Sequence, residues 1–185
     1  MTSTGVLRSR VILPDVIETP RLLLRPHRVE DLDRYAELLA EAETATPYAL
    51  PSFNREDAWA RLLRFIGHWA VFQYGLFVAE ERASGRIVAE VGIARFERAV
   101  DSRCEGMPEA GWRVAQRMRG SGVAKEAMTA AFAWFDGAIG APSTFCLIHP
   151  DNAPSLRLAD ALQFRELSRG SYKERPVITL VRTLA

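Results

Sequence analysis

The chain has 185 residues, a length that favours one domain with its own hydrophobic core. Hydrophobic residues make up 48% and charged residues 25% of it, as in ordinary globular proteins. The net charge of +1 argues against a broad basic field of the kind that binds nucleic acid or anionic membranes, and we expect neither as a partner. Cys104 and Cys146 have no spacing typical of metal ligands, so we expect no metal site.

The organisation of the chain is simple. Residues 1–15 have no clear pattern and are expected to form a loose arm, and residues 16–185 are expected to form the single domain. Arg8 and Arg10 interrupt any apolar segment of a signal peptide. The longest uncharged stretch, Gly67 to Ala79, is shorter than the roughly 18 apolar residues that span a bilayer. We therefore expect a cytoplasmic protein.

The first third of the chain predicts one strand and two helices. Val16 to Pro26 is a β-rich run flanked by prolines, and Val29 to Glu43 carries apolar residues at helical spacing. Thr46 to Phe53 holds two prolines and is expected to be a connection. Asn54 is a suitable N-cap for a second helix, with Asp57 in its first turn.

The remaining elements predict an α+β fold with a mixed, mostly antiparallel sheet and about four helices. The expected strands are Leu76 to Glu81, Ile87 to Phe96, Glu109 to Ala115, Thr144 to Ile148, Phe164 to Ser168 and Pro176 to Thr183. The expected helices cover Gly122 to Ala138 and the segment through Leu156 and Leu162 to Gln163. If the strands before and after the helix Gly122 to Ala138 are neighbours, they must run parallel.

The stretch from Arg117 to Ala124, with the sequence RMRGSGVA, is the most informative part of the chain. It joins a predicted strand to a predicted helix. Gly120 and Gly122 let backbone N–H groups converge without side-chain obstruction. The first turn of the helix adds unpaired N–H donors and the positive end of its dipole. This turn therefore predicts a site for a phosphate-bearing ligand, although a glycine pair alone also occurs in ordinary strand-to-helix turns.

A second group of residues surrounds the start of the last predicted helix. Asn152 is followed three residues later by Ser155, with Pro154 between them. Helix capping explains this pattern by itself, because Asn is a favoured N-cap and Pro a favoured first-turn residue. A capping side chain can also face a ligand, so both interpretations stay open.

Together these stretches resemble the GNAT N-acetyltransferases. The Arg-x-x-Gly-x-Gly-x-Ala pattern is similar to their acyl-CoA pyrophosphate loop, and Asn-x-x-Ser to the helix entry of the RimJ/RimL-like branch. Glu18 to Arg25 resembles the opening strand of that branch, and Pro108 to Trp112 the entry of its fourth strand. The family usually has Gly where this chain has Gln163, which puts the local cap geometry in doubt.

The resemblance implies a GNAT fold in which the parallel pair of strands splays apart and pantetheine inserts between them. Acetyl-CoA would then be the co-substrate, with no metal. Its phosphates would contact the side chains of Arg117 and Arg119 and the backbone of residues 119 to 124. The full set of expected CoA-binding residues is Val114, Arg117, Arg119, Gly120, Ser121, Gly122, Val123, Ala124, Asn152 and Ser155. The N–H of Val114 would meet the acetyl carbonyl oxygen, and Asn152 a pantetheine amide.

Two carboxylates are candidates for the general base. Glu109 enters the strand before the phosphate loop, where the branch often carries Glu; an ordinary strand-end carboxylate is the alternative. Glu90 lies in an apolar strand, so it must face a polar cleft, be paired or lie on the exposed face of the sheet. Ser155 matches the serine of the family near the thioester sulfur, where it would donate to the thiolate or bind the pantetheine arm.

The sequence thus predicts an N-acetyltransferase that moves an acetyl group from acetyl-CoA to a primary amine, a protein N-terminus or a small molecule. The amine would attack directly in a ternary complex, because no cysteine adjoins the motifs to carry a covalent intermediate. A non-catalytic acyl-CoA-binding or sensor module and a nucleotide-binding protein are the alternatives. The resemblance is also compatible with a homodimer.

Overall fold

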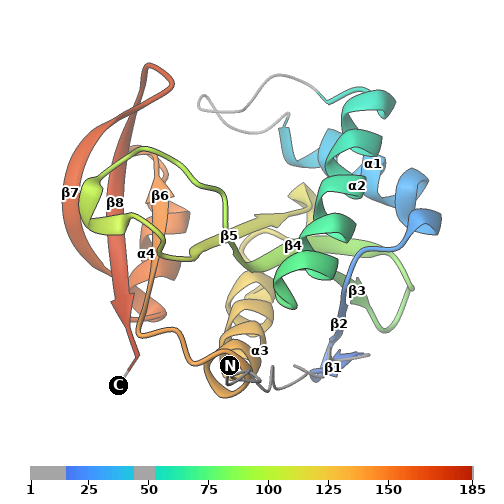
Figure 1. Ribbon diagram of the computed structural model, residues 1–185. Coiled ribbons are helices and arrows are strands. Elements are labelled where there is room, and N and C mark those ends of the chain that lie inside the picture. Colours follow the sequence, from blue (N-terminus) through green and yellow to red (C-terminus); the bar gives the residue numbers. More distant parts are fainter. Residues whose placement is uncertain (1–15, 44–52, 185) are drawn as a thin grey trace, which may run out of the picture.

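The computed structural model describes residues 16–43 and 53–184. Figure 1 shows its helices and strands in the colours of the sequence. The expected arm at 1–15 and most of the expected connection at Thr46 to Phe53 lie outside the described residues. Both expectations therefore stay predictions.

Eight strands form a single sheet in the order β1-β2-β3-β4-β5-β6-β8-β7. The strands are β1 (Ile17–Glu18), β2 (Leu22–Arg25), β3 (Leu76–Glu81), β4 (Ile87–Ala94), β5 (Glu109–Val114), β6 (Ser143–Ile148), β7 (Arg165–Tyr172) and β8 (Arg175–Thr183). The helices are α1 (Leu32–Glu43), α2 (Arg55–Phe72), α3 (Val123–Ala138) and α4 (Ala153–Ala161). Three short 3₁₀ turns complete the described fold: η1 (Val29–Asp31), η2 (Ser102–Cys104) and η3 (Gln116–Met118). The predicted α+β class, mixed sheet and four helices are confirmed.

The expected single strand at Val16 to Pro26 is wrong. It is a tight hairpin in which β1 pairs antiparallel with β2, with Ile17 opposite Leu24. The turn forms because the N–H of Thr19 donates to the carbonyl oxygen of Leu22 at 2.9 Å, while the Thr19 hydroxyl oxygen accepts from the Leu22 N–H at 2.9 Å. Pro20 follows Thr19 and cannot donate to a strand ladder.

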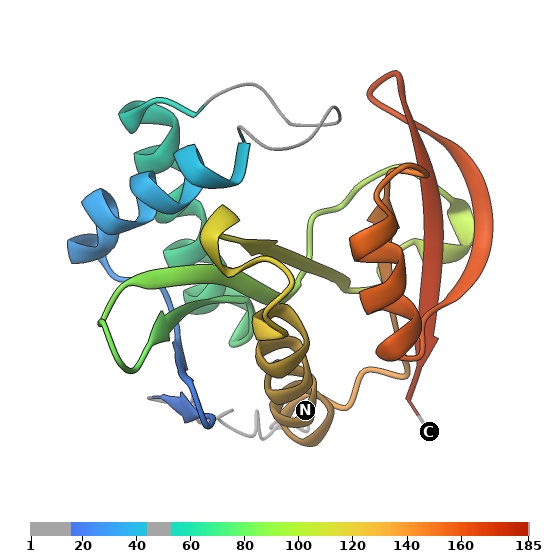
Figure 2. The ribbon, with the colours of Figure 1, turned by 180° about the vertical axis from the view of Figure 1, so that it is seen from behind.

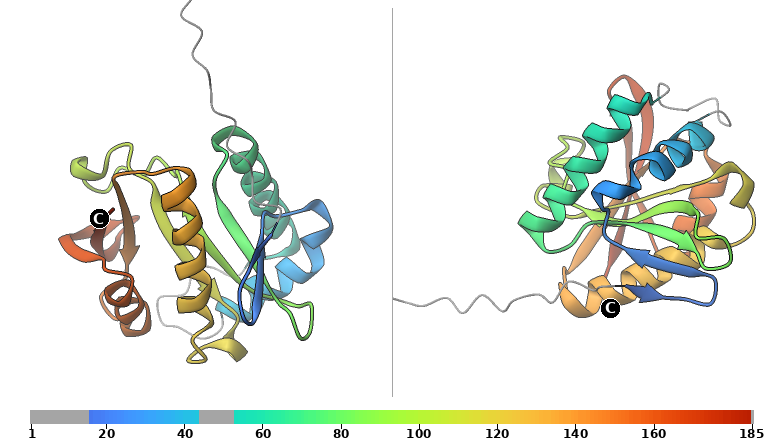
Figure 3. Two further views of the ribbon diagram at one scale, coloured as in Figure 1. Left: turned by 90° about the horizontal axis from the view of Figure 1, so that it is seen from below. Right: turned by 90° about the vertical axis from the view of Figure 1, so that its right-hand side faces the viewer.

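Helices cover both faces of the first half of the sheet. α1 and α2 lie on one face and α3 on the other (Figures 1 and 3). On the first face Leu38 and Leu62 are fully or almost fully buried with Val78 of β3. On the second face Met128 and Phe132 of α3 pack in a larger core cluster with Val91 of β4. The Asn54 cap of α2 is confirmed, because its side chain accepts from the Asp57 N–H at 2.9 Å.

The sheet opens between β5 and β6. These strands run parallel and share one register pair, Glu109 with Phe145, where the Phe145 N–H donates to the Pro108 carbonyl oxygen at 3.0 Å. Beyond that point the strands diverge, as Figure 2 shows from behind. β6 continues instead as an antiparallel partner of β8 along its whole length, from Ser143 to Ile148. The predicted splay of the parallel pair is confirmed.

The terminal hairpin is longer than predicted, since β7 runs from Arg165 to Tyr172 and β8 starts at Arg175. β7 is an edge strand with exposed or half-buried side chains throughout, so it lacks the apolar alternation that marks a strand in sequence. Gln163, before this hairpin, adopts a left-handed backbone with φ of 68°. This is the conformation that glycine adopts most easily. Within the part of the chain that the structure describes, no helix has the length and apolar character needed to cross a bilayer.

Candidate acyl-CoA site

The edge of β5 that faces the divergence carries open backbone groups. The Ala115 N–H donates to the Val88 carbonyl oxygen at 2.9 Å, so this residue bonds toward β4. Hydrogen-bonded and non-hydrogen-bonded pairs alternate along an antiparallel ladder. The N–H groups of Trp112 and Val114 therefore point away from β4, toward the opened side of the sheet. An extended ligand lying between β5 and β6 could pair with them as another strand would.

The turn after β5 presents a second set of donors. Gly120 and Gly122 have φ of 74° and 82°, a left-handed backbone that favours glycine. Gly122 is the N-cap of α3 and has no side chain to satisfy the first turn of the helix. Among the described residues, the N–H groups of Val123 and Ala124 contact no hydrogen-bond acceptor. An anion at this helix start would meet unpaired N–H groups and the positive end of the α3 dipole.

Not every N–H in the expected 119–124 stretch is open. The Arg119 N–H donates to the Gln116 carbonyl oxygen at 3.2 Å, and the Ser121 N–H donates to that of Met118 at 3.4 Å. The Ser121 hydroxyl also donates to the Met118 carbonyl oxygen, at 2.6 Å. These bonds hold the turn in shape, which leaves the remaining amides to a ligand.

Arg21 fastens this turn to the β1–β2 hairpin, a role that sequence reasoning missed. Its Nε donates to Glu126 Oε2 at 2.7 Å, and its Nη1 donates to the Ser121 carbonyl oxygen at 2.9 Å. The Thr19 hydroxyl donates to Glu126 Oε1 at 2.6 Å. Arg21 lies in a stretch that carries the family resemblance, and Glu126 lies in the first turn of α3, just after the glycine turn. Their pairing could not be read from a linear motif, because 105 positions separate them.

The two expected phosphate arginines have different surroundings. Arg117, in η3, forms an ion pair with Glu41 of α1, so it would have to exchange this partner for a phosphate. Arg119 is exposed at the end of η3, beside the glycine turn. Lys125, in the first turn of α3, is exposed as well. The role of each in binding phosphate stays a prediction.

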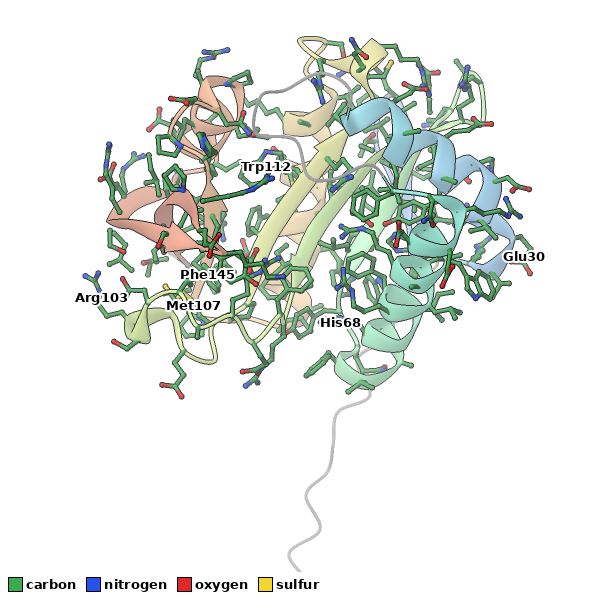
Figure 4. The ribbon with its side chains drawn as sticks, turned by 90° about the horizontal axis from the view of Figure 1, so that it is seen from above. Glu30, His68, Arg103, Met107, Trp112 and Phe145 are labelled. Atoms are coloured by element: carbon green, nitrogen blue, oxygen red, sulfur yellow. The ribbon has the colours of Figure 1, made fainter. Side chains whose placement is uncertain are left out.

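Asn152 and Ser155 meet Trp112 across the divergence. Asn152 caps α4, since its side-chain oxygen accepts from the Ser155 N–H at 3.2 Å. The Trp112 Nε1–H donates to the Ser155 hydroxyl oxygen at 3.1 Å, and Figure 4 shows Trp112 lying beside β5 on the side of the divergence. Indole nitrogen only donates, so Ser155 must accept and keeps its own proton for another acceptor. The capping interpretation of Asn152 is confirmed, and its contact with pantetheine stays a prediction.

Glu109 lies at the closed end of the divergence. It is 6% exposed, and its Oε2 lies 2.7 Å from Arg98 Nε. Burial raises the pKa of Glu109 to about 7, although the charge of Arg98 opposes this rise. The Arg98 guanidinium also stacks on the rings of Phe96 and Tyr172, at 4.8 and 5.0 Å from their centroids. A carboxyl group with this pKa can accept a proton near neutral pH, as a general base must.

Glu90 is the centre of a buried polar network on the face covered by α1 and α2. It is 2% exposed, which excludes the expected alternative of an exposed sheet face. Arg61 Nη2 donates to Glu90 Oε2 at 2.5 Å, the Tyr35 hydroxyl donates to Oε1, and His27 Nε2 lies 3.2 Å from Oε1. Burial alone would raise the pKa of Glu90, but Arg61 and His27 lower it below its usual value. Glu90 is thus a paired carboxylate and a poor proton acceptor at neutral pH.

The segment that joins β4 to β5 lines most of a cavity of about 550 Å³. It is lined by residues 95–102, 104–107 and Phe145. Figure 4 shows Phe145 and Met107 close together beside the loop that carries Arg103. Because Phe145 is also the residue where β5 and β6 still pair, the cavity adjoins the closed end of the divergence. Within residues 16–43 and 53–184, no cluster of His, Cys, Asp or Glu could hold a metal ion.

Comparison with known proteins agrees with this geometry. Residues 21–165 match the family model described as an acetyltransferase (GNAT) domain. A structure from Bordetella pertussis assigned to the GnaT acetyltransferase family has 30% sequence identity, a TM-score of 0.83, and a match over 92% of this chain and 100% of that one.

The structural neighbours include ribosomal-protein acetyltransferases. The ribosomal-protein-S5-alanine acetyltransferase from Vibrio fischeri has 17% identity and a TM-score of 0.71, over 91% of this chain and 96% of its own. RimJ from Mycobacterium smegmatis, in complex with CoA-disulfide, has 19% identity and a TM-score of 0.68, over 88% of this chain and 81% of its own. At these identities the likeness concerns the fold. On the family match and the Bordetella structure, the chain belongs to the GNAT family and is an acyl-CoA-dependent acetyltransferase.

Proposed function

We propose that this protein transfers an acetyl group from acetyl-CoA to a primary amine by direct attack in a ternary complex in the cytoplasm. One observation carries the proposal: the open edge of β5 leads from Glu109, at the closed end of the divergence, to the glycine turn at the start of α3. A ligand with an extended amide-bearing arm and a diphosphate would match both ends. Solved neighbours in complex with CoA-disulfide or with acetyl-CoA support the choice of ligand.

In this proposal the turn binds the diphosphate through the free N–H groups of Gly120 and residues 122–124, aided by Arg117 and Arg119. The pantetheine arm follows the open edge of β5 and meets Asn152. The Val114 N–H donates to the acetyl carbonyl oxygen and stabilises the negative charge that develops there. No residue of this set needs a metal ion.

How much a general base must contribute depends on the pKa of the acceptor amine. Deprotonating a lysine-like amine of pKa about 10.4 at pH 7 costs roughly 4.6 kcal/mol, and an N-terminal α-amine of pKa near 8 costs only about 1.4 kcal/mol. Glu109 takes the proton of the amine through intervening water as the nitrogen attacks the thioester carbon, because Glu109 and Val114 lie at opposite ends of β5. The raised pKa of Glu109, about 7, supports this role over Glu90.

Collapse of the tetrahedral intermediate breaks the C–S bond and releases a thiolate. Ser155 donates its hydroxyl proton to that sulfur and recovers a proton from solvent. Its hydrogen bond from Trp112 supports this direction of transfer, because it leaves the hydroxyl proton available. The products are the N-acetylated amine and coenzyme A.

A thiol-release assay with acetyl-CoA over a panel of amines tests the proposal, together with calorimetric titration of coenzyme A. We expect Glu109→Gln to lose turnover while the heat of coenzyme A binding persists. A non-catalytic acyl-CoA-binding module would bind coenzyme A but release no thiol with any amine. A nucleotide-binding protein would prefer ATP over coenzyme A. Sedimentation of the same sample would test the homodimer that the resemblance allows.

A further inference from the structure

Four arginines gather on the face of the sheet that carries Glu90 and Glu109. Arg61 and Arg64 lie on α2, Arg98 precedes β5 and Arg113 lies on β5. Aromatic rings separate them. Phe53 lies under Arg61 and Arg113, at 5.9 and 5.1 Å; Phe65 lies under Arg61 and Arg64, at 4.8 and 5.0 Å; and Phe96 lies under Arg98 at 4.8 Å. Phe65 and Phe96 contact each other edge to face, with centroids 6.3 Å apart. We call these four arginines the arginine cluster.

At Gly111 the floor beside this cluster has no side chain. Glu109, Gly111 and Arg113 share one face of β5, because successive residues of a strand alternate in direction. Ala110, Trp112 and Val114 pack toward the core on the α3 side, which places the first three on the side of α1 and α2. Gly111 lies opposite Gly92 of β4, and a Cβ at Gly111 would meet no atom within 4 Å. Open space therefore lies over Gly111, between Glu109 at one end and Arg113 at the other.

The charges along this floor are unequal. Arg113 lies opposite Glu90 in the β4–β5 register, and Glu90 already binds Arg61, Tyr35 and His27. At the other end Glu109 pairs with Arg98. Arg61 and Arg98 of the cluster are thus each paired with a buried carboxylate. Arg64 makes no ion pair with any described residue, although partial burial and the charge of Arg61 lower its pKa. An anion bound beside Arg64 would relieve the repulsion between Arg64 and the neighbouring Arg61 and Arg98.

We propose that the acceptor of this acetyltransferase is a small primary amine that also carries a carboxylate or a phosphate group. The arginine cluster binds the anionic group, while the amine lies over Gly111, within reach of Glu109 and next to the open edge of β5. This inference rests on the proposed function, because it places the acceptor on the α1/α2 face of the same site. Guanidinium groups suit it, since they bind carboxylate and phosphate through paired hydrogen bonds.

Matched pairs of amines test this inference. Glutamate and glutamine are compared to test recognition of a carboxylate. Phosphoethanolamine and ethanolamine are compared to test recognition of a phosphate group. We expect kcat/KM for at least one anionic member to exceed that of its neutral partner by about tenfold or more, the effect of one charge-assisted contact. In Arg64→Gln this ratio should fall toward one, and Arg64→Lys should retain most of it.

Arg55→Gln is the matched control, because Arg55 lies in the first turn of the same helix and pairs with the exposed Asp33. It should leave the ratio unchanged. Equal kcat/KM for both members of each pair, or transfer to neither member by protein that binds coenzyme A, would overturn the inference and leave the coenzyme A site standing. Loss of the calorimetric signal for coenzyme A in wild-type protein would instead refute the proposed function.

Discussion

The indole Nε1 of Trp112 donates a hydrogen bond of 3.1 Å to the hydroxyl oxygen of Ser155 and so joins β5 to α4 across the divergence of the sheet. The two residues lie 43 positions apart in the sequence. Their contact fixes both the place of the Ser155 hydroxyl and the direction in which its proton can move. The structure thus gives this serine a defined orientation in addition to its place in the first turn of α4.

Replacing Ser155 by Ala removes the proposed proton donor to the thiolate. We expect kcat to fall by about a hundredfold, the lower end of the range for a positioned proton donor, with little change in the affinity for coenzyme A. Steady-state kinetics and calorimetry measure the two effects separately. Trp112→Phe, which keeps an aromatic ring but loses the N–H, should lower kcat less than Ser155→Ala. A wild-type kcat in Ser155→Ala would exclude the donor role.

The raised pKa of Glu109 predicts the pH dependence of catalysis. A base with a pKa of about 7 is protonated and inactive below that pH, so kcat/KM should rise with pH up to about 7. Glu109→Gln should lose this limb of the profile along with most of the activity. Glu97→Gln is the control, because Glu97 is an exposed carboxylate paired with Arg95. If Glu109→Gln retains the limb, the base lies elsewhere.

Glu90 should matter for stability. Replacing it by Gln leaves Arg61 without its buried charge partner, and breaking such a pair costs about 3–5 kcal/mol of unfolding free energy. Because the pKa of Glu90 in the folded protein lies below its ordinary value of 4.5, the stabilising contribution of Glu90 is present above pH 4.5 and is lost as the pH falls below it.

Urea unfolding at pH 7 and at progressively lower pH checks this sign. The difference between wild type and Glu90→Gln should shrink as the pH drops below about 4.5, the unfolded-state value. Glu166→Gln serves for comparison, since Glu166 pairs with Arg169 on exposed β7. A difference that grows in acid would show that Glu90 is protonated in the folded protein.

Two glycines at opposite ends of α3 allow a matched pair of substitutions, one in the glycine turn and one far from it. Gly122→Ala puts a side chain on a left-handed residue, which costs roughly 1–2 kcal/mol of strain and shifts the amides at the helix start. We expect a clear loss of affinity for coenzyme A. Gly137→Ala, near the exposed end of the same helix, should add about 1 kcal/mol of stability and leave binding unchanged. Calorimetry on both variants distinguishes them, and equal affinities would argue against phosphate binding at this turn.

Local patterns predicted most of the fold. The glycine turn, the Asn54 and Asn152 caps and the parallel strands around α3 each follow from residues close together in the chain. The β1–β2 hairpin was missed, because Pro20 flanks a short apolar run that also fits a single strand. The full length of the edge strand β7 does not follow from the sequence, because β7 is polar and lacks apolar alternation.

The candidate site was less visible, because its contacts join distant segments. Glu109 and Ser155 were identified from the family pattern, whereas their partners Arg98 and Trp112 were not. Nothing in an overall charge of +1 reveals that four arginines converge on one face of the sheet. Arg61 and Arg64 are three residues apart on a helix, a spacing that also fits an ordinary solvated face.

The central claim is that the main chain of the glycine turn binds the diphosphate of coenzyme A while the pantetheine arm lies along the open edge of β5. A crystal structure of the complex with acetyl-CoA tests it most directly. The account predicts phosphate oxygens within hydrogen-bond distance of the amides of residues 122–124, and the acetyl carbonyl oxygen next to the Val114 N–H. Acetyl-CoA bound elsewhere, with these amides turned toward solvent, would contradict it.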